Sequence, residues 1–188
     1  DEPDRNGRWR RGPGKALFDA VAGAVPGLDL LAEDLGVITP PVERLRRALG
    51  LPGMVVLHFG FDGPPGNVNR PGNITEDRVA YTGTHDNQTT LGWWHAARPE
   101  QRAAAVYAAR ERGIDDPEPW WMMIRLAMAS PARTAIISLQ DVLGLGEEAR
   151  MNHPGTSEGN WSWRLEPGAL GARHAERMAA ASAASGRA

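Results

Sequence analysis

The sequence contains no cysteine, no long apolar run and no excess of basic residues, and each absence excludes a class of protein. Without cysteine there are no disulfides and no thiolate metal sites, which is typical of a reducing compartment such as the cytoplasm. No apolar run is long enough to span a membrane, and the charged, glycine-rich start is not a signal peptide. The formal net charge of −2 gives no basic surface for nucleic acid. We therefore expect a cytoplasmic protein with neither membrane nor nucleic-acid partners.

The composition is that of an ordinary globular protein, with 41% hydrophobic and 23% charged residues in a chain of 188 residues. This length is enough for one domain with a core of its own, provided that the core is complete. The chain begins with Asp1 rather than methionine, which suggests a fragment or a processed product.

Apolar periodicity and turn signals divide the chain into alternating strands and helices. Helical spacing predicts helices over 15–25, 40–50, 98–113, 119–130 and, in an alanine-rich tail, 172–188. Short apolar or β-branched runs predict strands over 28–36, 54–63, 79–83 and 133–144, and irregular segments are predicted over 64–75 and 150–164. This alternation favours an α/β fold with a parallel sheet. The sheet is either small and open or part of a (β/α)8 barrel, because a whole barrel needs about 250 residues.

Three of the four predicted strands end in polar or acidic residues. Glu33 and Asp34 end the first, Asp62 the second, and residues 84–87 the third. Because the carboxyl ends of parallel strands lie at one edge of a sheet, carboxylates far apart in sequence can meet there. Two such carboxylates can carry out glycoside chemistry, one as a protonated general acid and the other ionised. Each residue also has an ordinary interpretation: Asp34 and Asp62 as turn residues, Glu33 as a solvated charge, and Asp86 with Asn87 as a turn or a helix N-cap. The strand ends alone therefore do not decide.

A metal site is the more specific alternative to glycoside chemistry, and it would make the protein a metal-dependent hydrolase. His85 and Asp86 are adjacent, and His58 and His95 are near them in sequence. No two histidines have the spacing of a helical metal site, and adjacent strand residues point to opposite faces of a sheet. The residues themselves therefore leave turn, metal site and glycoside chemistry open.

The seven tryptophans are more than is typical for this length, and six of them fall in three groups: Trp93–Trp94, Trp120–Trp121, and Trp161 with Trp163. Aromatic faces with polar rims suit sugar rings, whose C–H faces are apolar and whose edges need hydrogen bonds. For the second group, core packing is the simpler explanation. The residues of the last group alternate at strand spacing, which would place both on one face.

Four stretches in this order carry a specific resemblance: AEDLGVITPPVERLR, LPGMVVLHFGFDG, VAYTGTHDNQTTLGWW and LQDVLGLGEEARMNHPGTSEGNWSWR. They resemble the amylomaltases, the 4-α-glucanotransferases of glycoside hydrolase family 77, over residues from about 7 to about 164. The resemblance implies a (β/α)8 TIM barrel, of which this chain is the C-terminal half with strands five to eight and their covering helices. Residues 1–188 would then be the C-terminal portion of the catalytic domain, with 165–188 as a frayed helical tail.

The resemblance also implies a site and a reaction. Glu33 matches the family's general acid/base, and Asp86 matches the carboxylate that stabilises the transition state. His85 matches a residue that hydrogen-bonds sugar hydroxyls, and Asn152 matches a substrate-contacting position. We expect Asp34 to contact the substrate as well. The implied reaction is a retaining double displacement on α-1,4-glucans such as maltooligosaccharides, starch or glycogen. Segments are transferred to an acceptor glucan or glucose, and no metal or organic cofactor is required.

One departure from the family pattern is decisive. The family's nucleophile is an aspartate in an R-x-D-H motif upstream of this region, and no such motif occurs here. Smaller departures are Gln88, where an acidic residue is common, and the glycine of PGN at 71–73, where the family often has histidine. We therefore expect the isolated chain to be poorly stable and inactive. A non-catalytic α-glucan-binding module is the alternative function.

Overall fold

The computed structural model describes residues 10–187, and this part of the chain divides between Met54 and Val55 into two compact units. We call them the N-terminal unit and the C-terminal unit. Features predicted for residues 1–9 and 188, including the start of the family resemblance near residue 7, lie outside the described residues.

The N-terminal unit contains two helices, α1 (Lys15–Ala24) and α2 (Pro40–Ala48), close to where the sequence predicts them. Thr39 precedes α2 in an extended conformation, and prolines occupy the first turn, where no amide hydrogen is needed. The strand predicted over 28–36 is wrong, because these residues have no regular structure. Leu28 and Leu31 are 50% and 53% exposed. An apolar run becomes a strand only when a neighbouring strand pairs with its backbone, and no ladder forms on this segment among the described residues.

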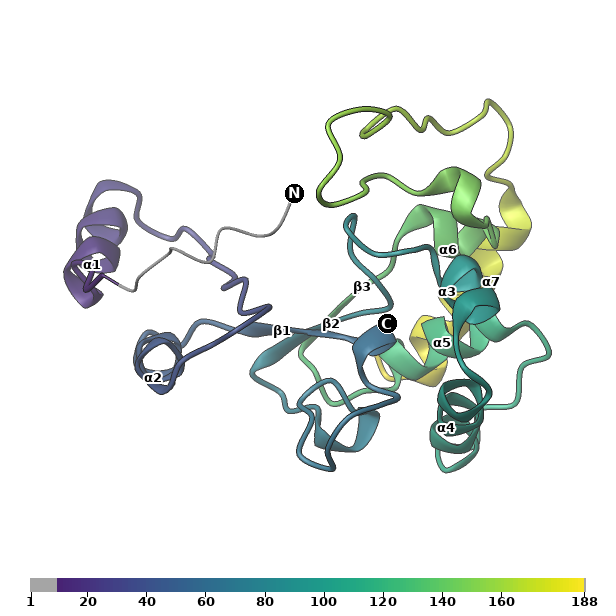
Figure 1. Ribbon diagram of the computed structural model, residues 1–188, viewed down its shortest axis with the longest axis horizontal. Helices are drawn as coiled ribbons and strands as arrows, with labels where there is room; N and C mark the ends of the chain where they lie inside the picture. The colour runs from purple at the N-terminus through teal and green to yellow at the C-terminus, as the bar shows by residue number, and fades with distance from the viewer. Residues whose placement is uncertain (1–9, 188) are drawn as a thin grey trace. The chain divides into compact units, whose positions relative to one another are not determined.

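The C-terminal unit is built on a three-stranded sheet with the order β1 (Gly53–Val56), β2 (Arg78–Tyr81) and β3 (Thr134–Ile136) (Figure 1). Strands β2 and β3 are parallel, with Val79 opposite Thr134 in the register. The α/β class with a parallel sheet is therefore confirmed, with three strands in place of four.

The predicted strands over 54–63 and 133–144 are both longer than the real ones. After β1 the chain turns into the 3-10 helix η1 (Leu57–Phe59), and after β3 it enters helix α6 (Leu139–Leu143). The side chain of Ser138 accepts a hydrogen bond from the amide of Asp141, which is the N-cap that starts α6. A short apolar run does not distinguish a strand from the buried helix that follows it.

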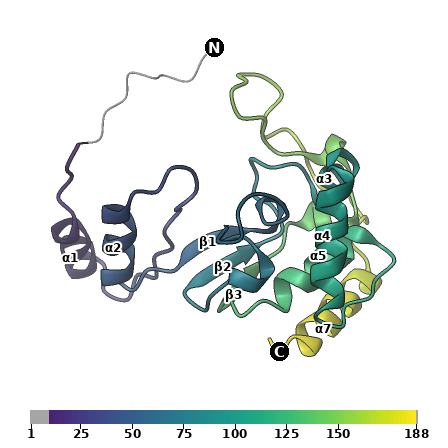
Figure 2. The same ribbon diagram turned by 60° about the horizontal axis from the view of Figure 1, so that its bottom comes forward.

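The remaining helices of the C-terminal unit lie together beside the sheet, with α5 in their middle (Figures 1 and 2). Their bounds are α3 (Thr90–Ala96), α4 (Pro99–Arg110), α5 (Pro119–Met128) and α7 (Ala172–Ala184), with short 3-10 helices η2 (Pro71–Asn73) and η3 (Glu147–Ala149). The prediction of a buried helix over 119–130 is confirmed, because most residues of α5 are buried. Trp121 is one of them, as expected for a core residue.

The C-terminal tail is a packed helix rather than a frayed one. His174 and Ala181 of α7 are buried. Beyond the helix, the guanidinium of Arg187 donates hydrogen bonds to backbone carbonyls of the segment that links α5 to β3: Met128 (2.6 Å), Ser130 (2.9 Å), Ala132 (2.6 Å) and Arg133 (3.1 Å). A helix at the end of a chain is expected to fray because alanine side chains bury little surface, but the Arg187 cation ties the residues after α7 to carbonyls at and beyond the end of α5. Residues 10–187 contain no helix with the length and apolarity needed to cross a bilayer.

Gly144 and Gly113 form a matched pair for testing how tightly the C-terminal unit is packed. Both have positive φ angles, +67° and +64°. A methyl group at Gly144 would lie 2.7 Å from the ring of Trp120, whereas one at Gly113 would meet nothing within 4 Å. We expect Gly113→Ala to cost about 1 kcal/mol through backbone strain, and Gly144→Ala about 1–3 kcal/mol more through overpacking. Urea unfolding of both variants measures the difference; equal losses would contradict this packing.

Candidate active site

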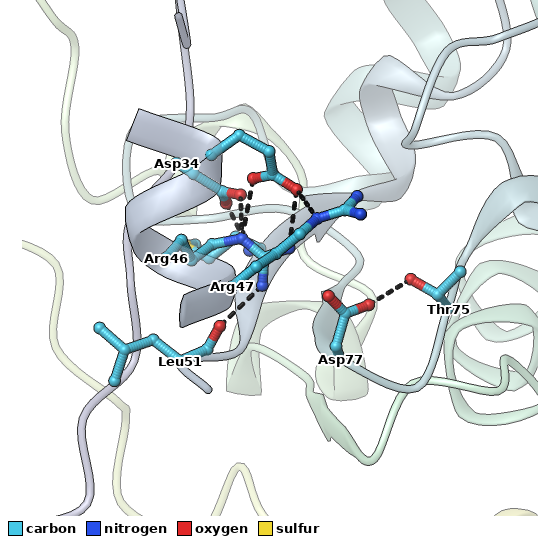
Figure 3. Close-up of polar contacts among 8 residues, drawn as sticks. Asp34, Arg46, Arg47, Leu51, Thr75 and Asp77 are labelled. Atoms are coloured by element: carbon cyan, nitrogen blue, oxygen red, sulfur yellow. Dashed lines mark hydrogen bonds and ion pairs between the residues drawn. The ribbon is translucent and has the colours of Figure 1, made fainter. Parts of the chain in front are cut away.

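The carboxylate of Asp34 is held inside the N-terminal unit (Figure 3). It accepts a hydrogen bond from the amide of Met54 at 2.7 Å and pairs with Nε of Arg46 at 3.5 Å. The side chains of this ion pair are only 6% and 3% exposed. Arg46 is itself fixed, because it also binds both carboxylate oxygens of Glu43 and the carbonyl of Leu51. Asp34 therefore ties its segment to α2 and to the start of β1.

Glu33 lies between two anchored residues and is itself exposed. On one side, the amide of Ala32 donates to the carbonyl of Pro52 at 2.9 Å. On the other side is the Asp34 anchor. The backbone of Glu33 is thus held at both neighbours while its carboxylate faces solvent, which suits a group that meets a substrate.

In the C-terminal unit, His85 and Asp86 lie on a turn between β2 and α3. The hydroxyl and the amide of Thr84 both donate to Oδ1 of Asn87, at 2.8 and 2.9 Å. The amide of Asn87 donates back to the carbonyl of Thr84 at 3.1 Å. Asp86 and Asn87 therefore belong to a turn rather than to a helix N-cap, and this turn leaves the Asp86 carboxylate available for a chemical role. The N-cap of α3 is Thr89, whose hydroxyl accepts from the amide of Gly92.

The Asp86 carboxylate is the point at which three predicted site residues meet. Its Oδ1 accepts a hydrogen bond from Nδ2 of Asn152 at 2.6 Å and lies 3.3 Å from Nε2 of His85. The side chains of His85 and Asp86 are 50% and 47% exposed. The structure therefore brings three of the predicted site residues, His85, Asp86 and Asn152, together at a surface that a ligand can reach.

Arg150 is part of this arrangement, and sequence reasoning missed it. Its guanidinium donates to the carbonyl of Asp86 at 2.8 Å and to the carbonyl of Asn152 at 2.9 Å. The amide of Asn152 donates to the carbonyl of His85 at 3.1 Å. Arg150 thus joins two loops that are about 60 residues apart, and spacing in the sequence gives no signal for such a contact.

Trp161 adds an aromatic face beside His85. Its ring centroid is 4.9 Å from that of His85, and the side chain is 52% exposed. It is the non-glycine residue with a positive φ (60°) in the described part of the chain. This costs backbone energy for a bulky residue. The amide of Trp161 donates to the carbonyl of Met151 at 2.7 Å, which helps to hold the strained position. The strand spacing predicted for Trp161 and Trp163 is wrong, because no strand forms here.

His58 and His95 do not join His85 and Asp86 in a metal site. His58 is buried and stacks on Trp93, with ring centroids 5.2 Å apart, and His95 is exposed on α3. Among residues 10–187 no three histidine or carboxylate side chains are grouped so that they could hold a metal ion. Asp62, at the predicted end of the second strand, is exposed and contacts Gln101 and Arg98, in keeping with a turn residue.

The comparisons with known proteins decide the family. A family model described as 4-alpha-glucanotransferase matches residues 1–170. The chain belongs to the 4-alpha-glucanotransferase family. It is 48% identical over 179 residues to a 4-alpha-glucanotransferase of Thermus thermophilus, covering 93% of this chain and 36% of that protein. It is also 48% identical over 159 residues to a chloroplastic/amyloplastic 4-alpha-glucanotransferase of Arabidopsis thaliana, covering 85% of this chain and 27% of that protein.

Solved structures agree with this family assignment. An amylomaltase from Streptococcus agalactiae, solved in complex with acarbose, matches with a TM-score of 0.88 and 34% identity. The match covers 97% of this chain and 37% of that one. The chain thus spans roughly a quarter to slightly more than a third of the length of these 4-alpha-glucanotransferases.

His58 gives the C-terminal unit a predictable response to acid. Burial lowers the pKa of His58 from 6.5 to about 4, and the nearby charge of Asp141 raises it only partly. Between these values the unfolded chain binds a proton that the folded chain does not, so the free energy of unfolding falls as the pH is lowered from 6.5 to about 4. The full loss is about 3 kcal/mol.

Urea unfolding at several pH values from 7 to 4 measures this response. We expect His58→Gln to remove this part of the pH dependence, and His95→Gln to leave it unchanged because His95 is exposed. If the free energy of unfolding of His58→Gln depended on pH as steeply as that of the wild type, the folded protein would bind the His58 proton as readily as the unfolded chain does, which would contradict the lowered pKa.

Proposed function

We propose that this chain is the C-terminal half of the (β/α)8 catalytic barrel of a 4-alpha-glucanotransferase. The parent would move α-1,4-glucan segments to an acceptor glucan or glucose by a retaining double displacement. The observation that carries this proposal is the half-exposed Asp86 carboxylate at the end of β2, held by Asn152 and flanked by His85. Residues 1–188 are then the C-terminal portion of one catalytic domain, which would act in the cytoplasm.

The uncovered face of strand β3 supports a partial barrel. Strand β3 is the last strand in the order of the sheet, and the side chains of Thr134 and Ile136, which point to the same face, are both exposed, Ile136 by 40%. Parallel sheets normally have both faces covered. In the parent, the rest of the barrel would cover this face.

The proposed roles follow the geometry. Asp86 stabilises the oxocarbenium-like transition state, because a carboxylate held by a hydrogen bond is already oriented when positive charge develops. His85 and Asn152 lie at the same carboxylate, where they can hold sugar hydroxyls. The exposed ring of Trp161 offers an apolar face to a sugar ring beside them.

Glu33 is the proposed general acid/base. It would protonate the leaving oxygen and then deprotonate the 4-hydroxyl of the acceptor. Asp34, predicted to contact the substrate, has an amide and a guanidinium as protein partners. We infer that its main task is to hold the backbone on which Glu33 stands.

The substrates proposed are maltooligosaccharides, starch or glycogen. This rests on the names of the relatives and on the acarbose complex of the Streptococcus agalactiae amylomaltase. The nucleophile would come from an upstream R-x-D-H motif, which this sequence lacks. Since a double displacement needs that nucleophile, the isolated chain should bind maltodextrin at most and should not disproportionate maltotriose. If the chain were part of a non-catalytic glucan-binding module, the isolated chain would bind maltodextrin in the same way. The two functions differ in the full-length chain, which would disproportionate maltotriose only if it is a transferase.

Charge-removing variants in the full-length chain test the assignment of the two carboxylates. We expect Glu33→Gln to lower kcat for maltotriose disproportionation by about 100- to 10,000-fold, because the proton transfer is lost. Asp86→Asn should lower it by at least about 100-fold, since a preorganised charge is lost. Maltodextrin binding should persist in both variants.

Glu100→Gln is the matched control, because Glu100 is an exposed carboxylate in the first turn of α4. It should leave kcat and binding unchanged. A Glu33→Gln or Asp86→Asn enzyme with the activity of this control would refute the assigned roles.

A further inference from the structure

A single buried carboxylate closes the loop that carries His85 and Asp86. Asp141, in helix α6, is 1% exposed. Its Oδ2 accepts hydrogen bonds from the hydroxyls of Thr82 at 2.5 Å and of Thr90 at 2.8 Å, and its Oδ1 accepts from the amide of Thr90 at 2.6 Å. Thr82 directly precedes Gly83–Thr89 and Thr90 directly follows it. Both ends of the seven-residue loop are therefore bound to one side chain.

The buried side chain of His58 is also part of this hydrogen-bond network. Its Nε2 lies 3.1 Å from the hydroxyl of Thr90. That hydroxyl has one proton, which it donates to Asp141, so its oxygen accepts a hydrogen bond from Nε2 of His58. The Nδ1–Cε1 edge of the same ring lies against Gly83, where an added methyl group would lie 2.6 Å from Cε1 of His58. The ring thus fills the space beneath the start of the loop.

The loop depends on this network because its two functional side chains are not packed in the core. His85 and Asp86 are half-exposed, whereas Thr82, Thr90 and Asp141 are almost completely buried. A carboxylate that stabilises a developing charge works only if its position is fixed in advance. The exposed residues cannot provide that rigidity, and the buried contacts at the two ends of the loop can.

We propose that Asp141, through Thr82, Thr90 and His58, is the positioning group that sets the place of Asp86 and His85 for transfer. This inference rests on the proposed function of Asp86. Asp141 is not itself a catalytic residue, since it is buried and touches the reacting groups only through the loop. The network gives a physical role to His58 and Asp141, which the roles assigned to Glu33, Asp86, His85 and Asn152 leave unexplained.

The test compares Thr90→Val with Thr90→Ser in the full-length chain that carries this segment. Valine keeps the shape of threonine but removes the hydroxyl that bonds Asp141 and His58, whereas serine keeps the hydroxyl. We expect Thr90→Val to lower kcat for maltotriose disproportionation by about 100-fold, because small displacements of a catalytic group cost about that much. The KM should change little, and Thr90→Ser should restore most of kcat.

Hydrogen exchange separates positioning from loss of stability. In Thr90→Val the amides of Asp86, Asn87 and Asn152 should exchange about tenfold faster, while amides in the centre of α5 keep their protection. Asp116→Asn is the matched control: Asp116 has an 8% exposed carboxylate that pairs with Arg177 in the same unit. It should leave exchange at the three loop amides unchanged.

The outcomes distinguish the two proposals. If the wild-type full-length chain does not transfer glucan, the proposed function fails, and the exchange data still decide whether Asp141 orders the loop. If the wild type is active and Thr90→Val keeps full kcat with unchanged loop exchange, the positioning role of Asp141 is overturned. Equal loss of kcat in Thr90→Ser and Thr90→Val would also overturn it.

Discussion

The hydrogen bonds accepted by the Asp141 carboxylate are the contact on which the rest of the C-terminal unit depends. They join the end of β2, the start of α3 and helix α6 at one point inside the protein. Burying a carboxylate is costly unless hydrogen bonds surround it. Three hydrogen bonds surround the Asp141 carboxylate, and they are satisfied only when Thr82 and Thr90 are in their observed positions. The two ends of the exposed turn that carries Asp86 are thereby fixed.

A second segment reaches the same turn from far along the chain. Arg150 and Asn152 bind the backbone and the carboxylate of Asp86, and Trp161 covers one side of His85. Trp161 adopts a strained backbone conformation there, which a structure retains only where the surrounding contacts require it. The exposed side chains of His85 and Asp86 are thus held in two ways: by the buried hydrogen bonds of Asp141 at the ends of their loop, and by the contacts of Arg150, Asn152 and Trp161.

Local patterns predicted much of this fold, and contacts distant in sequence account for what they missed. The helices were found because their periodicity, prolines and glycines are local signals. The strand expected over 28–36 failed because a strand also needs a partner, which sequence periodicity does not supply. The ends of β1 and β3 were misplaced because a buried strand and the helical turn after it are equally apolar.

The candidate site was also predicted only in part from the sequence. The polar end of β2 indicated a site, and the family resemblance assigned roles to its residues. Arg150 and Asp141 escaped notice because an arginine that binds backbone carbonyls and an aspartate that binds threonines follow no spacing rule. Asp34 shows the converse case, since it was predicted to contact the substrate and the structure pairs it with a buried arginine.

The most direct test of the account is a graft into a relative of known activity class. The matching segment of the Thermus thermophilus 4-alpha-glucanotransferase, 48% identical over 179 residues, would be replaced by this chain. We expect the chimera to disproportionate maltotriose, and we expect Asp86→Asn in the graft to lower kcat by at least about 100-fold. A folded chimera without transfer, or one in which Asp86→Asn keeps full activity, would contradict the claim that this loop carries the stabilising carboxylate.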